Sequence, residues 1–344
     1  MYAVVIHAPK DLRVEPLAVP DLGPRDVQVR IERGGICGSD LHYYHHGGFG
    51  TVRLKEPMVL GHEVSGTVEA VGGEVGSVSP GGRVAVNPSR PCRTCRYCQE
   101  GRHNHCLDMR FYGSAMRFPH VQGAFRQVLI ADAVQCHAVP TSLSAAEAAM
   151  AEPLSVCLHA AKQAGSLYGK RVLVTGSGPI GTLSVIAARR GGAVEIVATD
   201  LADAPLAIAK QVGADRTINV ADEPEALAGY ATGKGTFDVL FEASGNAKAL
   251  ISSLDVLRPG GVIVQLGLGD PAPLPINTIV AKELELRGSF RFHGEFALAV
   301  DLMAKQLVDV RPLVTATLPF ERAIEAFELA SDRSRSMKVQ LAFA

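Results

Sequence analysis

The sequence predicts a two-domain α/β protein that joins a β-rich domain to a doubly wound domain built on a parallel sheet. Three observations lead to this prediction. The chain has 344 residues, which is enough for two separate hydrophobic cores. Up to about residue 145 it contains short runs of β-type residues between Gly and Pro turn signals. From about Ser144 onward, Ala-rich helical stretches alternate with short apolar strands, which is the pattern of βαβ units.

The β-rich domain is predicted over residues 1–145 and 290–344, so the chain is expected to return to it near its end. After about residue 290, the helical stretch Phe296–Met303 and the closing strand Lys338–Leu341 no longer follow the alternation of the middle part. The clearest strands of the first segment are Val27–Ile31, Val64–Val71 and Arg83–Val86.

The middle segment, residues 146–289, carries a glycine-rich turn between a strand and a helix. Gly176-Ser-Gly-Pro-Ile-Gly181 follows the apolar strand Arg171–Thr175 and leads into an apolar helix. The first glycine permits a tight turn, the second lets a pyrophosphate approach the backbone, and the third lets the helix pack on the strand. The free N–H groups of the helix then face the phosphates. This context favours a Rossmann domain, whose expected cofactor contacts are Gly176, Gly178, Pro179, Ile180, Gly181 and Asp200.

Asp200 ends the second predicted strand of this domain, 24 residues after Gly176. An acidic side chain at this place can accept both ribose hydroxyls of NAD. The following Leu201-Ala-Asp-Ala204 offers no Arg or Lys to pair with a 2′-phosphate, so NAD is expected to be preferred and NADP to be the poorer cofactor. The alternative is an ordinary strand–turn–helix with a solvated aspartate.

Charge and hydropathy exclude several classes of protein. There are 34 Lys and Arg against 35 Asp and Glu, and no block of like charge, so neither a nucleic acid nor a membrane surface is an expected partner. The first residues lack a basic segment followed by a long apolar one, so no signal peptide is expected. No apolar run approaches the roughly 18 residues of a membrane span. A cytoplasmic protein is therefore the expectation.

Four of the seven cysteines lie within fifteen residues, and an odd total is a poor disulfide framework. The spacing x2, x2 and x7 offers four soft thiolates in one loop, and zinc takes such a set tetrahedrally with no position left for substrate. The sequence therefore predicts a closed, structural zinc site at Cys92, Cys95, Cys98 and Cys106.

A second set of metal-ligand residues is scattered. Cys37 lies in Gly-Ile-Cys-Gly-Ser-Asp, His62 and Glu63 lie in Gly-His-Glu, and Glu152 lies in Glu-Pro-Leu. A catalytic zinc needs about three protein ligands and an open position for water or substrate. Each residue alone has an ordinary structural explanation, and spacing in the sequence cannot join them.

These motifs and the glycine-rich turn, taken in this order, resemble the zinc-dependent medium-chain dehydrogenases of the sorbitol dehydrogenase branch, over essentially the whole chain. The resemblance implies a GroES-like β-barrel catalytic domain followed by a Rossmann domain. It implies zinc ligation by Cys37, His62 and one of Glu63 or Glu152, with water completing the set. It also implies that Ser39 relays the substrate's proton, and that the enzyme is a homo-oligomer, a tetramer or a dimer.

Several longer strings resemble the L-idonate 5-dehydrogenase group within that branch, which interconverts L-idonate and 5-keto-D-gluconate. Among them are Asp108-Met-Arg-Phe111 and Leu286-Arg-Gly-Ser-Phe-Arg-Phe292. A sugar acid differs from a polyol by a carboxylate, which the planar fork of an arginine can hold through two bonds. The candidate substrate contacts are Tyr43, Arg110 and Arg291. Arg110 is the more discriminating arginine, because related polyol dehydrogenases also resemble the sequence at Arg291. Each has a structural alternative: an arginine paired to a nearby acid, or a tyrosine packed in the core.

Two alternatives stay open. One is a polyol dehydrogenase acting on sorbitol or xylitol. The other is a non-catalytic NAD-binding protein of the same fold, which would be expected to lack both the Cys37–His62 pair and the four-cysteine loop.

Overall fold

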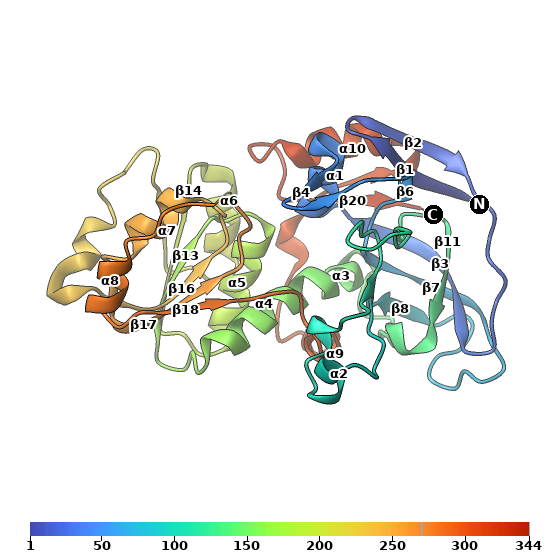
Figure 1. Cartoon of the computed structure of the whole chain (residues 1–344), viewed down its shortest axis with the longest axis horizontal. Helices are drawn as coiled ribbons and strands as arrows, with labels where there is room; N and C mark the ends of the chain where they lie inside the picture. The colour runs from blue at the N-terminus through green and yellow to red at the C-terminus, as the bar shows by residue number, and fades with distance from the viewer. Residues whose placement is uncertain (270, 344) are drawn as a thin grey trace.

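The computed structural model describes residues 1–269 and 271–343. The chain forms two lobes that lie side by side, and both chain ends belong to the same lobe (Figure 1). Helices α4 (Ala151–Ala164) and α9 (Glu295–Ala304) lie between them. This arrangement follows from the sequence, because the chain leaves the β-rich lobe, builds the second lobe and then returns.

The β-rich lobe is organised around a seven-stranded sheet. Its central strands β3 (Asp26–Gly35) and β7 (Glu63–Val71) pair antiparallel, and they matter for the site because Gly35 at the end of β3 lies opposite Glu63 at the start of β7. The order is β12-β8-β7-β3-β20-β19, with β11 paired to β3. The other strands of this sheet are β8 (Arg83–Val86), β11 (Val128–Asp132), β12 (Cys136–Ala138), β19 (Val314–Pro319) and β20 (Lys338–Ala342).

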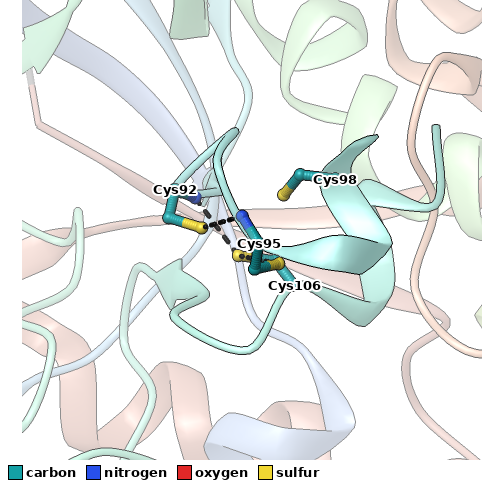
Figure 2. Close-up of side chains that lie close together, drawn as sticks. All are labelled: Cys92, Cys95, Cys98 and Cys106. Atoms are coloured by element: carbon teal, nitrogen blue, oxygen red, sulfur yellow. Dashed lines mark hydrogen bonds between the residues drawn. The ribbon is translucent and has the colours of Figure 1, made fainter. Parts of the chain in front are cut away.

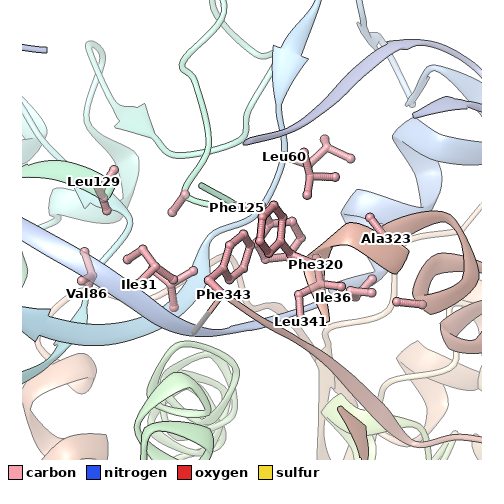
Figure 3. Packing of buried hydrophobic residues seen from close by; sticks show 14 of the residues in the cluster. Ile31, Ile36, Leu60, Val86, Phe125, Leu129, Phe320, Ala323, Leu341 and Phe343 are labelled. Atoms are coloured by element: carbon pink, nitrogen blue, oxygen red, sulfur yellow. The ribbon is translucent and has the colours of Figure 1, made fainter. Parts of the chain in front are cut away.

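Aromatic side chains from distant parts of the sequence fill the core of this lobe (Figure 3). The rings of Phe320 and Phe343 stack with centroids 5.0 Å apart, and the ring centroid of Phe125 lies 6.2 Å from that of Phe343. A Cβ on Gly61 would lie 2.1 Å from the Phe125 ring, and its φ of +90° also favours glycine. The core therefore fixes the backbone directly before His62.

Three-stranded and two-stranded sheets complete the β-rich lobe. β1 (Tyr2–Ala8) pairs with β2 (Asp11–Pro16) and β6 (Met58–Val59), and β4 (Gly48–Phe49) pairs with β5 (Val52–Arg53). The remaining short elements of the first half are α1 (Gly38–His46), β9 (Ser89–Arg90), α2 (Arg96–Gln99), the 3-10 turns His103–His105 and Ala133–Gln135, and β10 (Arg110–Phe111).

The second lobe is a doubly wound parallel sheet. Its strand order is β15-β14-β13-β16-β17-β18, and every neighbouring pair is parallel. The strand order reverses between β13 and β16, and ligands of such sheets bind outside the carboxyl ends of the strands at this switch point. The strands are β13 (Arg171–Thr175), β14 (Glu195–Asp200), β15 (Arg216–Asn219), β16 (Phe237–Glu242), β17 (Leu257–Gln265) and β18 (Glu285–Gly288); the helices are α5 (Pro179–Arg190), α6 (Asp203–Gln211), α7 (Ala247–Ser253) and α8 (Ile276–Ala281).

The chain crosses between the lobes through α3 (Ala145–Ala149) and α4. Ser144 caps α3, accepting a hydrogen bond from the N–H of Glu147. Met150 and Leu154 pack with Phe292 and Phe296 in an apolar cluster that joins α4 to α9. The last strands then rejoin the first sheet, where β20 pairs antiparallel with β3. This sheet membership supports our proposed division of the chain into residues 1–145 with 290–344 and residues 146–289.

The two-domain α/β fold agrees with the sequence prediction. Within the part of the chain that the structure describes, no helix combines the length and the hydropathy needed to cross a bilayer.

Candidate active site and metal centres

Strand pairing brings Cys37 and His62 together. Cys37 directly precedes α1 just after β3 ends, and His62 directly precedes β7. Because the end of β3 lies opposite the start of β7, residues just beyond both strands become neighbours. Ligand atoms of Cys37, His62 and Glu63 all lie within 4.8 Å of one another. The structure thus brings together Cys37, His62 and Glu63, whose proximity could not be inferred from their spacing in the sequence.

A buried carboxylate organises this group. Asp40 is fully buried and accepts hydrogen bonds from the N–H of Cys37 at 3.0 Å and the N–H of Gly61 at 3.2 Å. Its Oδ1 lies 3.7 Å from Nδ1 of His62, which is too long for a hydrogen bond, and that buried nitrogen has no other partner among the described residues. Asp40 therefore connects the segment at Cys37 with the segment at Gly61, and its carboxylate faces the imidazole of His62.

The two glutamates have different surroundings. Both carboxylate oxygens of Glu63 lie 2.8 Å from Nζ of Lys338, a buried ion pair between the start of β7 and the start of β20. Glu152 is buried in the first turn of α4, and burial is the main cause that raises its pKa to about 8. The structure brings Glu63 into the tight group and places Glu152 next to it, within electrostatic reach of His62. The zinc role of either carboxylate remains our proposal.

This donor set fits zinc. Burial, followed by the charge of Glu63, raises the pKa of the Cys37 thiol to about 11. A buried thiol and two buried carboxyl groups beside a single lysine would all be stabilised in their anionic forms by a divalent cation. The set of one sulfur, one imidazole nitrogen and carboxylate oxygen is one that zinc accepts, and these donor atoms already lie within 4.8 Å of one another.

Ser39 and Tyr43 lie on α1, directly after Cys37. Ser39 is half-buried in the first turn. Tyr43 is almost fully buried, and its hydroxyl accepts a hydrogen bond from the N–H of Ala115 at 2.9 Å. Tyr43 thus connects α1 to the segment 112–121 and packs in the core, while Ser39 keeps partial access to solvent.

Arg291 lies beside the metal group. Its guanidinium is 4.0 Å from the ring centroid of Phe111, and that ring lies 5.4 Å from the ring of His62. Nη2 of Arg291 is 3.1 Å from Sδ of Met116. Burial lowers the pKa of Arg291 to about 10. Within residues 1–269 and 271–343, no carboxylate oxygen lies within 4.0 Å of its guanidinium. A half-buried guanidinium without a carboxylate partner, next to metal ligands, is well placed to hold an anionic group of a ligand.

The structure does not bring Arg110 to this centre, contrary to the expectation from the sequence. Arg110 and Phe111 form the short strand β10, and successive side chains of a strand point to opposite faces. Phe111 is buried against His62, so Arg110 points away and is exposed. It lines a surface pocket together with Arg25 and Cys92.

The glycine-rich turn has the geometry expected of a phosphate cradle. Gly176 has a φ of +82°, and a Cβ on Gly181 would lie 1.7 Å from the carbonyl oxygen of Gly176. Gly178 precedes α5, whose first two residues are Pro179 and Ile180. A Cβ on Gly178 would meet nothing within 4 Å, so the space that its missing side chain leaves is open to a ligand.

Asp200 is fixed beside this turn at the end of β14. Its Oδ2 accepts the N–H of Ser177 at 2.7 Å, and its Oδ1 accepts the N–H of Leu201 at 2.7 Å. The carboxylate therefore stands at a defined place next to the cradle, as the hydroxyl pair of a ribose would require.

The four cysteines of the loop lie close together, although 14 residues separate the first from the last (Figure 2). Backbone N–H groups point at their sulfurs: Cys92 donates to Sγ of Cys106 at 3.1 Å, and Cys95 donates to Sγ of Cys92 at 3.4 Å. Hydrogen bonds, first from the side chain of Thr94, lower the pKa of Cys92 to about 6, and the N–H of Leu107 lowers the pKa of Cys95, whereas burial raises the pKa of Cys98 and of Cys106. Such donors stabilise thiolates, so this cluster fits a closed zinc site.

Lys338 is a site residue that the sequence analysis did not single out. The only signal was a charged side chain at the start of the closing strand, Lys338-Val-Gln-Leu341. Its partner Glu63 is 275 positions away. Phe111 and Met116, which hold Arg291, gave no signal of their own.

Comparison with known proteins gives consistent matches. Residues 23–141 match the alcohol dehydrogenase GroES-like domain, and residues 179–305 match the zinc-binding dehydrogenase family. L-idonate 5-dehydrogenase (NAD(P)(+)) of Escherichia coli K12 is 46% identical over 92% of this chain and 91% of its own length. Sorbitol dehydrogenase of Gallus gallus is 39% identical over 98% of this chain and 95% of its own length. The crystal structure of the E. coli L-idonate 5-dehydrogenase superposes with a TM-score of 0.95 at 43% identity, covering 99% of this chain and 97% of that one.

Proposed function

This chain belongs to the zinc-dependent, NAD(P)-linked medium-chain alcohol dehydrogenase family, and from that premise we propose that it oxidises a secondary hydroxyl of a sugar acid, converting L-idonate to 5-keto-D-gluconate. The observation that carries this proposal is Arg291, a half-buried guanidinium that lies over Phe111 beside His62 and has no carboxylate partner among the described residues. The proposed reaction turns a secondary alcohol and NAD⁺ into a ketone, NADH and a proton.

We assign the metal and the dinucleotide to separate sets of residues in this chain. We assign the catalytic zinc to Cys37, His62 and one of the neighbouring glutamates, and the dinucleotide to the Gly176–Gly181 turn and Asp200. When bound, zinc acts as a Lewis acid that lowers the pKa of the substrate hydroxyl, and NAD accepts the hydride.

The chain's own groups orient the substrate and move its proton. Arg291 would hold the carboxylate of the sugar acid through its two parallel N–H groups. Phe111 and Met116 fix this guanidinium from two sides, so little side-chain entropy is lost on binding. The half-buried hydroxyl of Ser39, two residues after Cys37, would accept the substrate's proton and pass it toward solvent. Asp40 fixes the backbone beside both ligands by accepting the N–H groups of Cys37 and Gly61, and Lys338 balances the charge of Glu63.

Replacing Arg291 by alanine should lower kcat/KM for L-idonate about ten- to a hundredfold, because a charge-assisted contact contributes roughly 1.5–3 kcal/mol. The loss for neutral sorbitol should be much smaller, which makes sorbitol the matched control. Arg291→Lys keeps the charge but not the planar fork, so its loss should be intermediate. Initial rates of NADH formation across aldonates and polyols measure all three. Equal losses on both substrates would mean that Arg291 only supports the fold.

A polyol dehydrogenase is the second candidate, because sorbitol dehydrogenases are also similar to this chain. The same assay decides between the two candidates. A higher kcat/KM of the unmodified enzyme for sorbitol or xylitol than for L-idonate would assign the polyol function.

NAD should be preferred over NADP. The Asp200 carboxylate lies beside the cradle and would repel a 2′-phosphate, and no cation occurs in the next four residues. Initial rates with each cofactor test this, and an equal or higher kcat/KM with NADP⁺ would contradict the role given to Asp200.

The homo-oligomer and the cytoplasmic location are parts of the same proposal. β18 is an edge strand of the parallel sheet, and apolar side chains are exposed there and on the adjoining α8: Leu286 at 46%, Ile276 at 59% and Val280 at 69%. A second copy covering this edge would bury them. Seven free cysteines agree with a reducing compartment. Light scattering after gel filtration should give a dimer or tetramer, and a monomer would contradict the assignment.

A further inference from the structure

Arg110 belongs to a surface pocket that the proposed reaction does not use. This pocket, which we call the arginine pocket, has a volume of about 540 Å³ and lies beside the four-cysteine loop. Its lining includes four arginines, Arg25, Arg90, Arg93 and Arg110, and two acids, Asp108 and Asp132.

Two aspartates and Cys92, whose four-thiolate zinc site would carry net negative charge, face the four arginines of the pocket, and three of these arginines have no carboxylate partner of their own in the described part of the chain. Asp132 is 3.6 Å from Arg90, and Asp108 pairs with Arg117, which is not part of the lining. The other three arginines of the pocket are Arg25, Arg93 and Arg110. Among the residues that the structure describes, no carboxylate lies within 4.0 Å of their guanidinium groups. Three unpaired guanidinium groups around one cavity attract an anion.

Strand pairing puts two of these arginines side by side. Arg90 on β9 and Arg110 on β10 are direct partners across an antiparallel pair, so their side chains leave the same face of the two strands. Like charges directly opposite each other destabilise a strand pair. An anion between the two guanidinium groups would turn this repulsion into attraction.

The backbone of two of these arginines is fixed before any ligand arrives, and the side chains of all four are exposed to a ligand from solvent. The carbonyl oxygen of Arg25 accepts the N–H of Ala133 at 3.0 Å, and the carbonyl oxygen of Arg93 accepts Nε2 of Gln99 at 3.0 Å. Arg93 also has a φ of +63°, a left-handed conformation that is costly for a residue other than glycine. Such a strained position is maintained only where the surrounding structure fixes it.

The arginine pocket is separate from the metal centre. On β10, Phe111 faces His62 and Arg291, while Arg110 leaves the opposite face toward the pocket. An anion held by Arg90 and Arg110 would therefore contact the β9–β10 pair from the side away from the zinc ligands.

We propose that the arginine pocket binds a small anion that carries at least two negative charges, of the phosphate or dicarboxylate class. Planar guanidinium forks suit both groups, because each offers paired oxygens for bidentate contacts. This site is distinct from both the sugar acid site at Arg291 and the phosphate cradle of the dinucleotide, so it does not depend on the proposed substrate.

Isothermal titration calorimetry tests the proposal on the zinc-loaded enzyme saturated with NADH, so that the cradle is filled. Inorganic phosphate and succinate are the two probes, and sodium chloride at matched ionic strength is the background. We expect one saturable site per chain for at least one probe. Tighter binding of phosphate would assign a phosphate ligand, and tighter binding of succinate would assign a dicarboxylate.

Variants locate the site. The double change Arg90→Ala and Arg110→Ala should weaken binding at least about tenfold, because it removes the two guanidinium groups that the strand pair brings together. Arg102→Ala is the matched control, since Arg102 is an exposed arginine of the same loop paired with Glu100 at 3.8 Å. Arg110→Gln alone, which disturbs the fold least, should weaken binding by a smaller factor. Thermal unfolding of each variant verifies that it is folded.

Three results would overturn the proposal. The first is the lack of saturable binding by either probe. The second is equal affinity of the unmodified enzyme and the double variant. The third is a loss of binding in Arg291→Ala but not in the double variant, which would place the anion at the substrate site.

Discussion

Replacing His62 by alanine should lower kcat at least about a thousandfold and leave the Kd for NADH within about twofold of its original value. His62 supplies one of three donor atoms that lie within 4.8 Å of one another, and Phe111 and Asp40 enclose its ring. His62 contributes the only imidazole nitrogen of this donor set, and the neighbouring Glu63 and Glu152 offer carboxylate oxygens instead. The dinucleotide cradle lies on the other lobe and should not change.

Three measurements on the same variant distinguish a chemical role from a structural one. Steady-state kinetics gives the loss of turnover, fluorescence titration gives the affinity for NADH, and elemental analysis should show one zinc per chain instead of two. His7→Ala is the control, because His7 pairs with Glu15 on the first hairpin at 3.1 Å and lies outside the metal group. A variant that keeps two zinc ions and most of its activity would refute the assignment of His62 as a ligand.

Local motifs could be predicted from the sequence because their residues are neighbours in the chain. The glycine-rich turn needs only a strand, six residues and a helix, and the four cysteines lie in one loop. The alternation of strands and helices likewise predicted the parallel sheet. In these cases the chemistry depends on spacing that the sequence itself displays.

Side-chain direction and long-range pairing could not be predicted. Arg110 and Phe111 are adjacent, and the face that each one takes depends on the pairing of β10 with β9, which no sequence period reveals in a strand of two residues. The ion pair of Lys338 with Glu63 depends on β20 returning to β3 after the whole second lobe. Tyr43 looked like a substrate contact, and the structure gives it a buried hydroxyl bonded to Ala115.

Replacing Cys95 by serine should destabilise the four-cysteine loop far more than it alters the chemistry at His62. Serine is a poor zinc ligand, and structural zinc contributes directly to folding free energy. The loop contains only the four-residue helix α2 and a three-residue turn, and it is joined to the rest of the chain by the hydrogen bond of Asn104 to Phe290 and the stacking of His103 on His293, so the metal should supply much of its stability. Opening of the loop should become easier by at least about 3 kcal/mol, which corresponds to roughly a hundredfold more of the open form.

Limited proteolysis with trypsin measures this opening, because Arg93, Arg96 and Arg102 lie in the loop and are exposed. Cleavage there should accelerate by about two orders of magnitude when opening precedes cleavage, and zinc content should fall to one ion per chain. Cys136→Ser is the matched control, since Cys136 is a buried thiol of the large sheet outside the cluster. A Cys95→Ser enzyme that resists trypsin as the unmodified enzyme does, keeps two zinc ions and has simply lost turnover would reverse the roles given to the two centres. The four-cysteine loop would then be part of the chemistry, and the group at His62 would have to account for stability instead.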